Sequence, residues 1–177
     1  MKTLFLLRHA KSDWADPDQS DFDRPLNARG RKAARAMGRE LRRLGLAADQ
    51  ILASPAARVA ETLALLADGY GARMPIDEDE RLYLASADAL LRIARNTDDR
   101  HSSRLLVGHN PGLHDLTLRL AQDGPGRAEV VAKYPTGALA EIAFNVDQWA
   151  EIAPASGQLA RFVRPRDLAA DFALDGD

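Results

Sequence analysis

The sequence contains the stretch Leu4-Phe5-Leu6-Leu7-Arg8-His9-Ala10, in which four apolar residues end at a charged pair. A short uninterrupted apolar run of this kind is typical of a strand that is buried on both faces of a parallel sheet. The same arrangement returns at Leu105-Leu106-Val107-Gly108-His109. Two buried strands that each run into a histidine predict an α/β domain with polar side chains gathered at one edge of its sheet.

Helix and strand signals alternate along the chain around these two strands. Helices are expected over residues 27–44, 55–67, 86–97 and 110–122, opened by Asn27, Ser54-Pro55, Ser86 and Asn110-Pro111. Further strands are expected over residues 50–53, 74–77, 138–146 and 157–163. This order predicts a three-layer α/β/α fold with a mostly parallel central sheet. We expect a single domain over residues 1–177, with a loosely held tail after about residue 168.

Composition excludes several classes of protein. The 177 residues carry 24 Lys and Arg against 26 Asp and Glu, and 46% of them are hydrophobic, which indicates a globular domain and not a bulk nucleic-acid binder. The absence of cysteine excludes disulfides, thiolate metal sites and a cysteine nucleophile. No apolar run approaches the roughly 20 residues of a membrane span, and the apolar start is too short for a signal peptide. We therefore expect a cytoplasmic protein without a membrane partner.

Three junctions between a strand and a helix carry the candidate functional residues. The first strand ends in Arg8 and His9, the second is followed by Arg58, and a later one ends in His109 and Asn110. Ligands of open α/β sheets bind outside the carboxyl ends of the strands, where these junctions meet. Two arginines and two histidines without a carboxylate among them predict a pocket for a dianionic group, with phosphate the obvious candidate.

Each of these residues also has a purely structural interpretation. A single histidine after a strand is more often a hydrogen-bonding residue than a catalyst, and Arg58 could pair with Glu61 or Glu40. The combination at three successive crevice positions favours the functional interpretation. The arginine-rich segment from Arg29 to Arg43 could bind nucleic acid, but the balanced charge favours a solvated helix face.

Other phosphate and metal motifs are missing. The sequence has no GxxxxGK[ST] or GxGxxG loop, and the aspartates of residues 16–23 do not follow an apolar strand or fit a calcium loop. His101 is expected in a surface loop and His114 on a helix near the mouth of the site, neither of them as a metal ligand. We expect no metal and no cofactor.

The sequence resembles the histidine phosphatase superfamily, also called phosphoglycerate-mutase-like. The resemblance rests on three segments: Leu7-Arg8-His9-Ala10, Ser54-x-x-x-Arg58-x-x-x-Thr62, and Val107-Gly108-His109-Asn110. Further similarity, at Arg24-Pro25-Leu26, Gly30, Leu82-Tyr83 and residues 164–168, is to the short SixA-like phosphohistidine phosphatases, and it extends over nearly the whole chain. The resemblance implies a phosphoglycerate-mutase-like fold.

The resemblance also implies a role for each matched residue. His9 would be the nucleophile that becomes a phosphohistidine, and Arg8, Arg58 and His109 would hold the phosphoryl oxygens, with no metal required. Ser12 and Asn110 are expected to contact the substrate. The family's usual Arg-His-Gly is Arg8-His9-Ala10 here, and the added methyl group could narrow the approach of the backbone to the ligand.

The proton donor and the substrate are less sharply indicated. Glu80, Asp18, Asp21 and Asp23 are candidates for the acid, and we expect Glu80, although pairing with a neighbouring arginine is an alternative. A phosphoramidate substrate would relax the need for an acid, because protonated imidazole leaves more readily than an alkoxide. The expected activity is hydrolysis of protein phosphohistidine; a small phosphomonoester substrate, or a non-catalytic phosphate-binding scaffold, remains as an alternative.

Overall fold

The computed structural model describes residues 1–168. The tail expected after about residue 168 therefore lies outside the described residues. The strands are β1 (Lys2–Arg8), β2 (Gln50–Ala53), β3 (Ile76–Glu78), β4 (Ser103–Gly108), β5 (Leu139–Phe144) and β6 (Gly157–Val163). The α-helices are α1 (Ala28–Arg43), α2 (Ala57–Tyr70), α3 (Ala87–Arg95), α4 (Gly112–Leu120) and α5 (Arg127–Ala132). Short 3-10 helices lie at η1 (Glu80–Leu82), η2 (Trp149–Glu151) and η3 (Pro165–Leu168).

The strands form one sheet in the order β3-β2-β4-β1-β5-β6. Strands β1, β2, β3 and β4 pair in parallel, whereas β5 pairs antiparallel with both β1 and β6. The predicted mostly parallel sheet is therefore confirmed. Because the parallel strands all end at the same edge, the residues that follow β1, β2 and β4 are brought together there.

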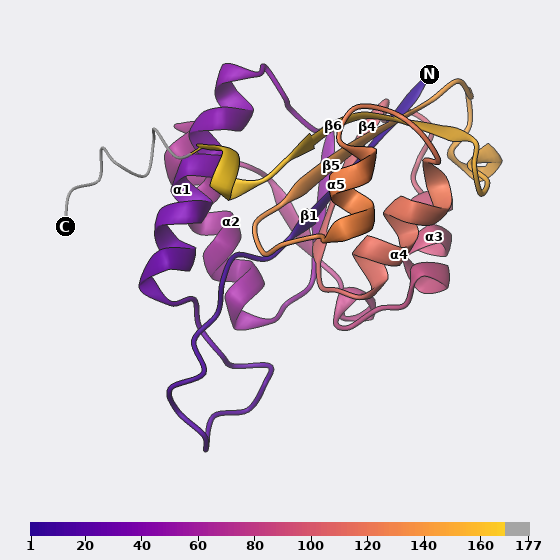
Figure 1. The fold of residues 1–177 in the computed structure, drawn as a ribbon. Helices are drawn as coiled ribbons and strands as arrows, with labels where there is room; N and C mark the ends of the chain where they lie inside the picture. Colours follow the sequence, from indigo (N-terminus) through magenta and orange to yellow (C-terminus); the bar gives the residue numbers. More distant parts are fainter. Residues whose placement is uncertain (169–177) are drawn as a thin grey trace.

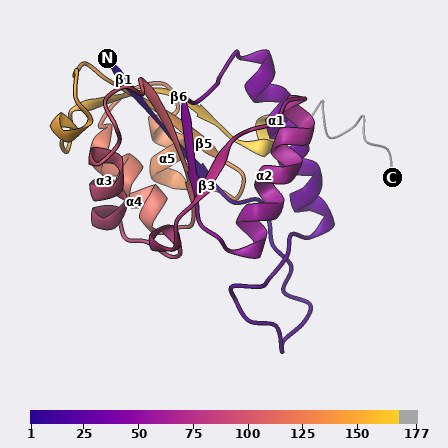
Figure 2. The ribbon, with the colours of Figure 1, turned by 180° about the vertical axis from the view of Figure 1, so that it is seen from behind.

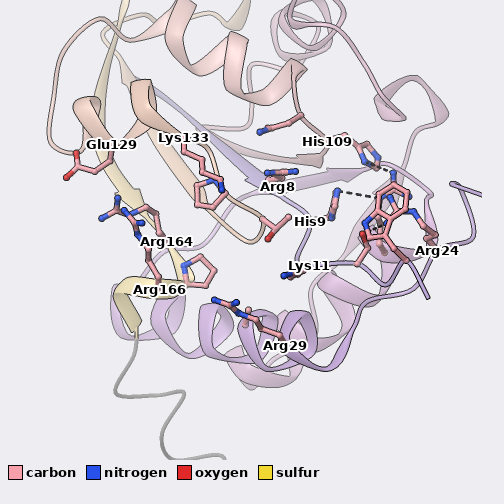
Figure 3. A pocket seen from close by; sticks show the side chains of 18 of the residues that line it. Arg8, His9, Lys11, Arg24, Arg29, His109, Glu129, Lys133, Arg164 and Arg166 are labelled. Atoms are coloured by element: carbon pink, nitrogen blue, oxygen red, sulfur yellow. Dashed lines mark hydrogen bonds between the residues drawn. The ribbon is translucent and has the colours of Figure 1, made fainter. Parts of the chain in front are cut away.

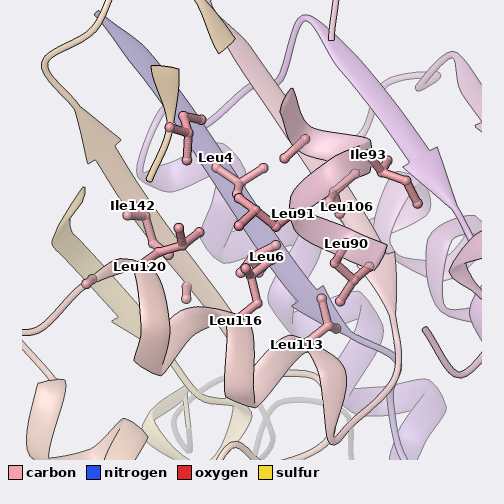
Figure 4. Close-up of a cluster of buried hydrophobic side chains, with 14 of the residues drawn as sticks. Leu4, Leu6, Leu90, Leu91, Ile93, Leu106, Leu113, Leu116, Leu120 and Ile142 are labelled. Carbon is pink, nitrogen blue, oxygen red and sulfur yellow. The ribbon is translucent and has the colours of Figure 1, made fainter. Parts of the chain in front are cut away.

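Helices cover both faces of the sheet. Figures 1 and 2 show α1 and α2 on one face and α3, α4 and α5 on the other. Alternate residues of β1 supply the two cores: Leu4 and Leu6 face α3 and α4 (Figure 4), while Phe5 and Leu7 face α1 and α2. The apolar run that ends at Arg8 is thus buried on both faces, and the predicted three-layer architecture is confirmed.

Two helix starts differ from the prediction. The helix expected from Pro55 begins at Ala57, and the one expected to open at Asn110-Pro111 begins at Gly112, after a cis Asn110-Pro111 bond. Ser54 and Asn110 were predicted as helix caps because each has a capping side chain and precedes a proline. Their side chains instead bond to residues brought near by the fold, as described below. Asn27 and Ser86 do cap α1 and α3, by accepting from the backbone N–H of Gly30 and Ala89.

The basic face of α1 is largely engaged with acidic residues. Arg31 bonds to Glu61 of α2 at 2.5 Å, Arg35 bonds to Asp68 at 2.9 Å, and Arg43 pairs with Glu40 within α1.

Helix α5 was not expected; it is six residues long and follows two glycines with positive φ, Gly124 and Gly126. Over residues 1–168, no helix has both the length and the apolar character that crossing a membrane requires.

Candidate active site

The three predicted junctions meet at the carboxyl edge of the sheet. The backbone N–H of His9 donates to Gly108 O at 3.1 Å, and that of Ser54 donates to Val107 O at 3.0 Å. The residues that follow β1, β2 and β4 are thereby held side by side by main-chain hydrogen bonds. Figure 3 shows Arg8, His9 and His109 facing one cleft from these segments.

His9 is held as a neutral imidazole with a defined tautomer. Its Nδ1 lies 2.7 Å from Ala10 O, a pure acceptor, so Nδ1 carries the hydrogen. Nε2 is then the lone-pair nitrogen, and Arg58 Nε donates to it at 3.4 Å. Burial lowers the pKa of His9 to about 3, and the charges of Arg58 and Arg8 act in the same direction. His9 therefore presents an unprotonated nitrogen to the cleft at neutral pH.

His109 lies beside His9 and is neutral for the same reason. The two ring centroids are 5.2 Å apart. Arg58 Nη2 lies 3.2 Å from His109 Nδ1, which assigns Nδ1 as the acceptor and leaves Nε2–H to donate to Ser54 Oγ at 2.8 Å. Burial and then the charge of Arg58 lower the pKa of His109 to about 4. Ser54 thus orients His109, which explains why it does not cap α2.

Arg8 and Asn110 share one anchor. Arg8 Nη1 and Asn110 Nδ2 both donate to the carbonyl oxygen of Tyr134, at 2.8 and 3.0 Å. The Tyr134 hydroxyl is buried, donates to Leu6 O and accepts from the N–H of Ala140. Within residues 1–168, the buried Arg8 Nε and Asn110 Oδ1 have no hydrogen-bond partner. An unpaired buried donor costs free energy, so Arg8 Nε is poised to receive an acceptor such as a phosphoryl oxygen.

Arg58 is paired with a carboxylate of the loop after β1. Glu61 and Glu40, the partners that a purely structural interpretation offered, bind Arg31 and Arg43, and Arg58 Nη2 donates to Asp21 Oδ2 at 3.0 Å. Tyr83 Oη donates to the same oxygen at 2.7 Å, while Arg24 binds Oδ1. Asp21 was one of the candidate acids in the sequence, and the long loop after β1 brings it back onto Arg58.

Asp21 is a strongly acidic carboxyl group. The hydrogen bond from Tyr83, followed by those from Arg24 and by the charge of Arg58, holds its pKa well below the usual value for aspartate. A general acid must carry a proton at the working pH. Asp21 is ionised there, so it positions Arg58 and Arg24 and does not supply a proton.

The remaining predicted residues fall into two groups. Ser12 is buried, lines the cleft and accepts a hydrogen bond from Arg24 Nη1, and the Arg24 guanidinium stacks on the Trp14 ring at 3.5 Å. Glu80 is exposed on η1 and is not among the residues that line the cleft. Its neighbour Asp79, not Glu80, pairs with Arg81.

Ala10 does not narrow the cleft. Its methyl group is buried against Leu26 and Ala34, and its N–H donates to Thr62 Oγ1 at 3.0 Å. The hydroxyl of Thr62 in turn donates to the carbonyl of Arg58. Thr62 therefore fixes the backbone next to His9 relative to Arg58.

The cleft is large and basic. Its volume is about 1380 Å³, and among the described residues that line it eight are cations and two are carboxylates. The cations are Arg8, Lys11, Arg24, Arg29, Arg58, Lys133, Arg164 and Arg166; the carboxylates are Asp21 and Glu129. Sequence reasoning missed most of this wall. Arg24, Arg164 and Arg166 were noted for the resemblance only. The lining residues of the segment 128–136 carried no functional signal in the sequence, because only the fold brings them to the cleft.

The described residues contain no group of three or more His, Asp or Glu side chains placed to hold a metal ion. His101 lies in the loop before β4, as expected. His114 lies on α4 but does not line the cleft; its Nε2 is 2.6 Å from Val130 O. Its helix face points toward α5, so His114 packs behind the wall of the cleft.

Comparison with known proteins agrees with this geometry. The family model for the histidine phosphatase superfamily (branch 1) matches residues 4–83. An uncharacterized protein of Mycobacterium tuberculosis is 33% identical over 164 residues, covering 90% of this chain and all of that protein. A SixA phosphohistidine phosphatase candidate from Agrobacterium tumefaciens has a structure 28% identical to this chain, with a TM-score of 0.78 over 93% of this chain and 98% of that one.

A protein histidine phosphatase SixA complexed with tungstate has a TM-score of 0.75 at 20% identity, over 94% of this chain and 99% of that chain, and shows the same fold. The sheet order, the helices on both faces and the site at the carboxyl edge are those of a phosphoglycerate-mutase-like fold. These likenesses support phosphatase activity. The chain belongs to the histidine phosphatase superfamily and is SixA-like.

Proposed function

We propose that this protein hydrolyses protein phosphohistidine by transferring the phosphoryl group to Nε2 of His9. The observation that carries the proposal is the state of that nitrogen: Nδ1–H is tied to Ala10 O, and Nε2 faces Arg58 as a lone pair. A neutral imidazole in a cationic pocket combines a nucleophile with groups that stabilise phosphoryl oxygens.

The proposed reaction has two displacements. In the first, the bond between phosphorus and His9 Nε2 forms as the bond from phosphorus to the substrate's imidazole breaks. Arg8 and Arg58 offset the charge on the phosphoryl oxygens. In a loose transition state for phosphoryl transfer, positioning and charge stabilisation are the main contributions that a protein makes. In the second, water attacks phosphorus, its proton passes to solvent, and inorganic phosphate leaves as His9 is regenerated.

His109 is proposed to contact the phosphoryl group after a change in its own protonation. Burial is the main cause of its lowered pKa and the charge of Arg58 is the next, and a dianion beside the ring would offset that charge. The protonated ring could then donate from Nδ1 to a phosphoryl oxygen. We further propose that Ser12 and Asn110, which line the cleft, contribute substrate contacts.

The shortage of a proton donor favours the N–P substrate. Asp21 is ionised, and Glu80 does not line the cleft. Glu129, the other carboxylate among the described lining residues, lies across the cleft from His9, beyond Lys133 and Arg164 (Figure 3). An alkyl phosphate would release an alkoxide that needs a proton, whereas a phosphohistidine substrate whose imidazole is already protonated releases a neutral ring. The site therefore suits a phosphoramidate better than an unactivated phosphomonoester.

The test compares a phosphohistidine peptide, an aryl phosphate and an alkyl phosphate, each with wild-type protein and His9→Ala in the presence of a metal chelator. We expect wild type to cleave the peptide fastest and the alkyl phosphate slowest, and His9→Ala to cleave none. Faster cleavage of the alkyl phosphate would favour a small-molecule phosphomonoesterase. Loss of activity with the chelator would contradict a metal-independent reaction, and an inert wild type that binds phosphate would favour a scaffold.

A further inference from the structure

The cleft continues well past His9 into a second set of basic residues. We call Lys11, Arg29, Lys133, Arg164 and Arg166 the distal basic group. They come from the loop after β1, the first turn of α1, the end of α5 and the segment at η3. Figure 3 shows them on the side of His9 that is opposite Arg24 and His109. This group is therefore separate from the residues proposed to hold the transferred phosphoryl group.

Most of the distal basic group is unpaired. Across the part of the chain that the structure describes, the side chains of Lys11, Arg29, Lys133 and Arg166 have no hydrogen bond or ion pair, whereas that of Arg164 binds Asp167 at 2.6 Å. Elsewhere on α1, the half-exposed Arg31 and Arg35 do have carboxylate partners. Glu129 and Asp167 are carboxylates beside the group, and both act on Arg164. Five cations against two carboxylates still leave an excess of positive charge, and such a field attracts an anion.

The shape of this region favours an extended ligand. A small-molecule pocket typically measures about 300–1,000 Å³, and the whole cleft exceeds that range at about 1380 Å³. Lys11, Arg29, Lys133 and Arg166 are exposed, flexible side chains from four separate segments and do not form a compact, buried cradle. Such a spread suits several carboxylates along a polypeptide better than one additional phosphate.

We propose that the distal basic group binds acidic side chains that flank the phosphohistidine of the protein substrate. This inference rests on the proposed function, because it assigns the surroundings of the histidine that the site would dephosphorylate. With the phosphoryl group at His9, the substrate chain runs along the cleft toward Lys133 and Arg166, and its Asp or Glu side chains meet the unpaired cations. The charges thus select among phosphohistidine proteins.

The test uses two phosphohistidine peptides that differ only in their flanking residues, Asp and Glu in one and Asn and Gln in the other. Exposed charge pairs each contribute a factor of about 1.5 to 5 in affinity. We expect wild type to show a kcat/KM about tenfold higher for the acidic peptide. This preference should shrink as salt is raised from 50 to 500 mM, because exposed charges are screened.

The double variant Lys133→Ala/Arg166→Ala locates the effect. We expect it to lose about fivefold in the ratio of kcat/KM between the acidic and the neutral peptide. Arg73→Ala is the matched control, since it removes an exposed cation from the loop between α2 and β3, at the opposite edge of the sheet. The control should keep the wild-type ratio.

Four results would overturn the inference. Equal kcat/KM for the two peptides in wild type, or an unchanged ratio in the double variant, would refute it while leaving the proposed function intact. If a small molecule with two phosphates is hydrolysed faster than the acidic peptide, the distal basic group binds a compact ligand and not a polypeptide. A wild type that cleaves neither peptide would overturn the proposed function itself, and this inference with it.

Discussion

Replacing Asp21 with asparagine should make the protein less stable and at the same time improve its binding of phosphate. Asp21 holds Arg58 and Arg24 through charged hydrogen bonds, but the same carboxylate occupies Arg58 Nη2, a donor that a phosphoryl group needs. Asp21→Asn keeps the shape and removes the negative charge. The loss of stability and the gain in phosphate binding both follow from the contact between Asp21 and Arg58.

The magnitude of the stability loss follows from burial. The side chain of Arg58 is 2% exposed and that of Asp21 is 43% exposed, so water screens one partner of the pair. A charged hydrogen bond contributes about 1.5–3 kcal/mol when buried. Allowing for the screening and for the hydrogen bonds that the amide retains, we expect a loss of about 1–2 kcal/mol. For a chain of this length that corresponds to a fall of about 2–8 °C in Tm.

The gain in phosphate affinity comes from removing a like charge beside the ligand. We expect the Kd for inorganic phosphate, measured by calorimetry at low salt, to fall about fivefold, which corresponds to about 1 kcal/mol. Asp23→Asn is the control, because Asp23 lies in the same loop and its carboxylate binds Ser20 and not a cleft arginine. A variant Asp21→Asn that binds phosphate no more tightly than wild type would refute the competition between carboxylate and ligand.

The pH dependence gives an independent check on the same pair. The pKa of Asp21 is lowered by folding, so its stabilisation is complete above the unfolded pKa of about 3.9 and is lost as the pH falls toward the lowered value. The stability difference between wild type and Asp21→Asn should therefore be constant from pH 5 to 8 and shrink below pH 4. A difference that grows on acidification would contradict this assignment.

Two further predictions concern packing and the histidines. Gly30→Ala should lower the free energy of unfolding by about 1–3 kcal/mol and also reduce activity. The added Cβ would lie 2.1 Å from Lys11 O and push α1 away from the segment that follows His9. An unchanged midpoint in chemical denaturation would contradict this packing. The native pKa values of about 3 for His9 and about 4 for His109 lie below the unfolded value of about 6.5, so stability should fall as the pH drops from 6.5 to 4, by up to about 1.4 kcal/mol per pH unit for each histidine. The fall should be shallower in His109→Asn, as measured by urea denaturation across this range, and an equal slope would count against a buried neutral His109.

The sequence was sufficient to predict those features that depend on local pattern. The apolar run before Arg8 and the one before His109 predict buried strands, and Asn27 predicts a cap that α1 uses. Ser54 and Asn110 were misassigned because a serine or asparagine after a strand has the same local signal whether it caps a helix or bonds to a distant group. Ser54 binds His109, 55 residues away, and only the sheet brings them together.

The contacts of the loop after β1 could not be predicted in the same way. Asp21 reaches Arg58 and Tyr83, which are 37 and 62 residues away, and no periodicity in the loop indicates where it folds. Lys133 and Arg166 reach the cleft from later parts of the chain for the same reason. Local pattern therefore brings His9, His109 and their arginines to one edge of the sheet, and the proposed role of His9 as nucleophile comes from the resemblance. The charges that surround these residues depend on tertiary structure.

Trapping the phosphorylated enzyme tests the central claim most directly. Wild-type protein mixed with a phosphohistidine peptide and quenched within milliseconds in alkali, where phosphohistidine is retained, would be digested and analysed by mass spectrometry. The account predicts one phosphoryl group on His9, formed faster than phosphate is released, and none in His9→Ala. Phosphate release without any phosphorylated His9, or a label on another residue in wild type, would contradict it.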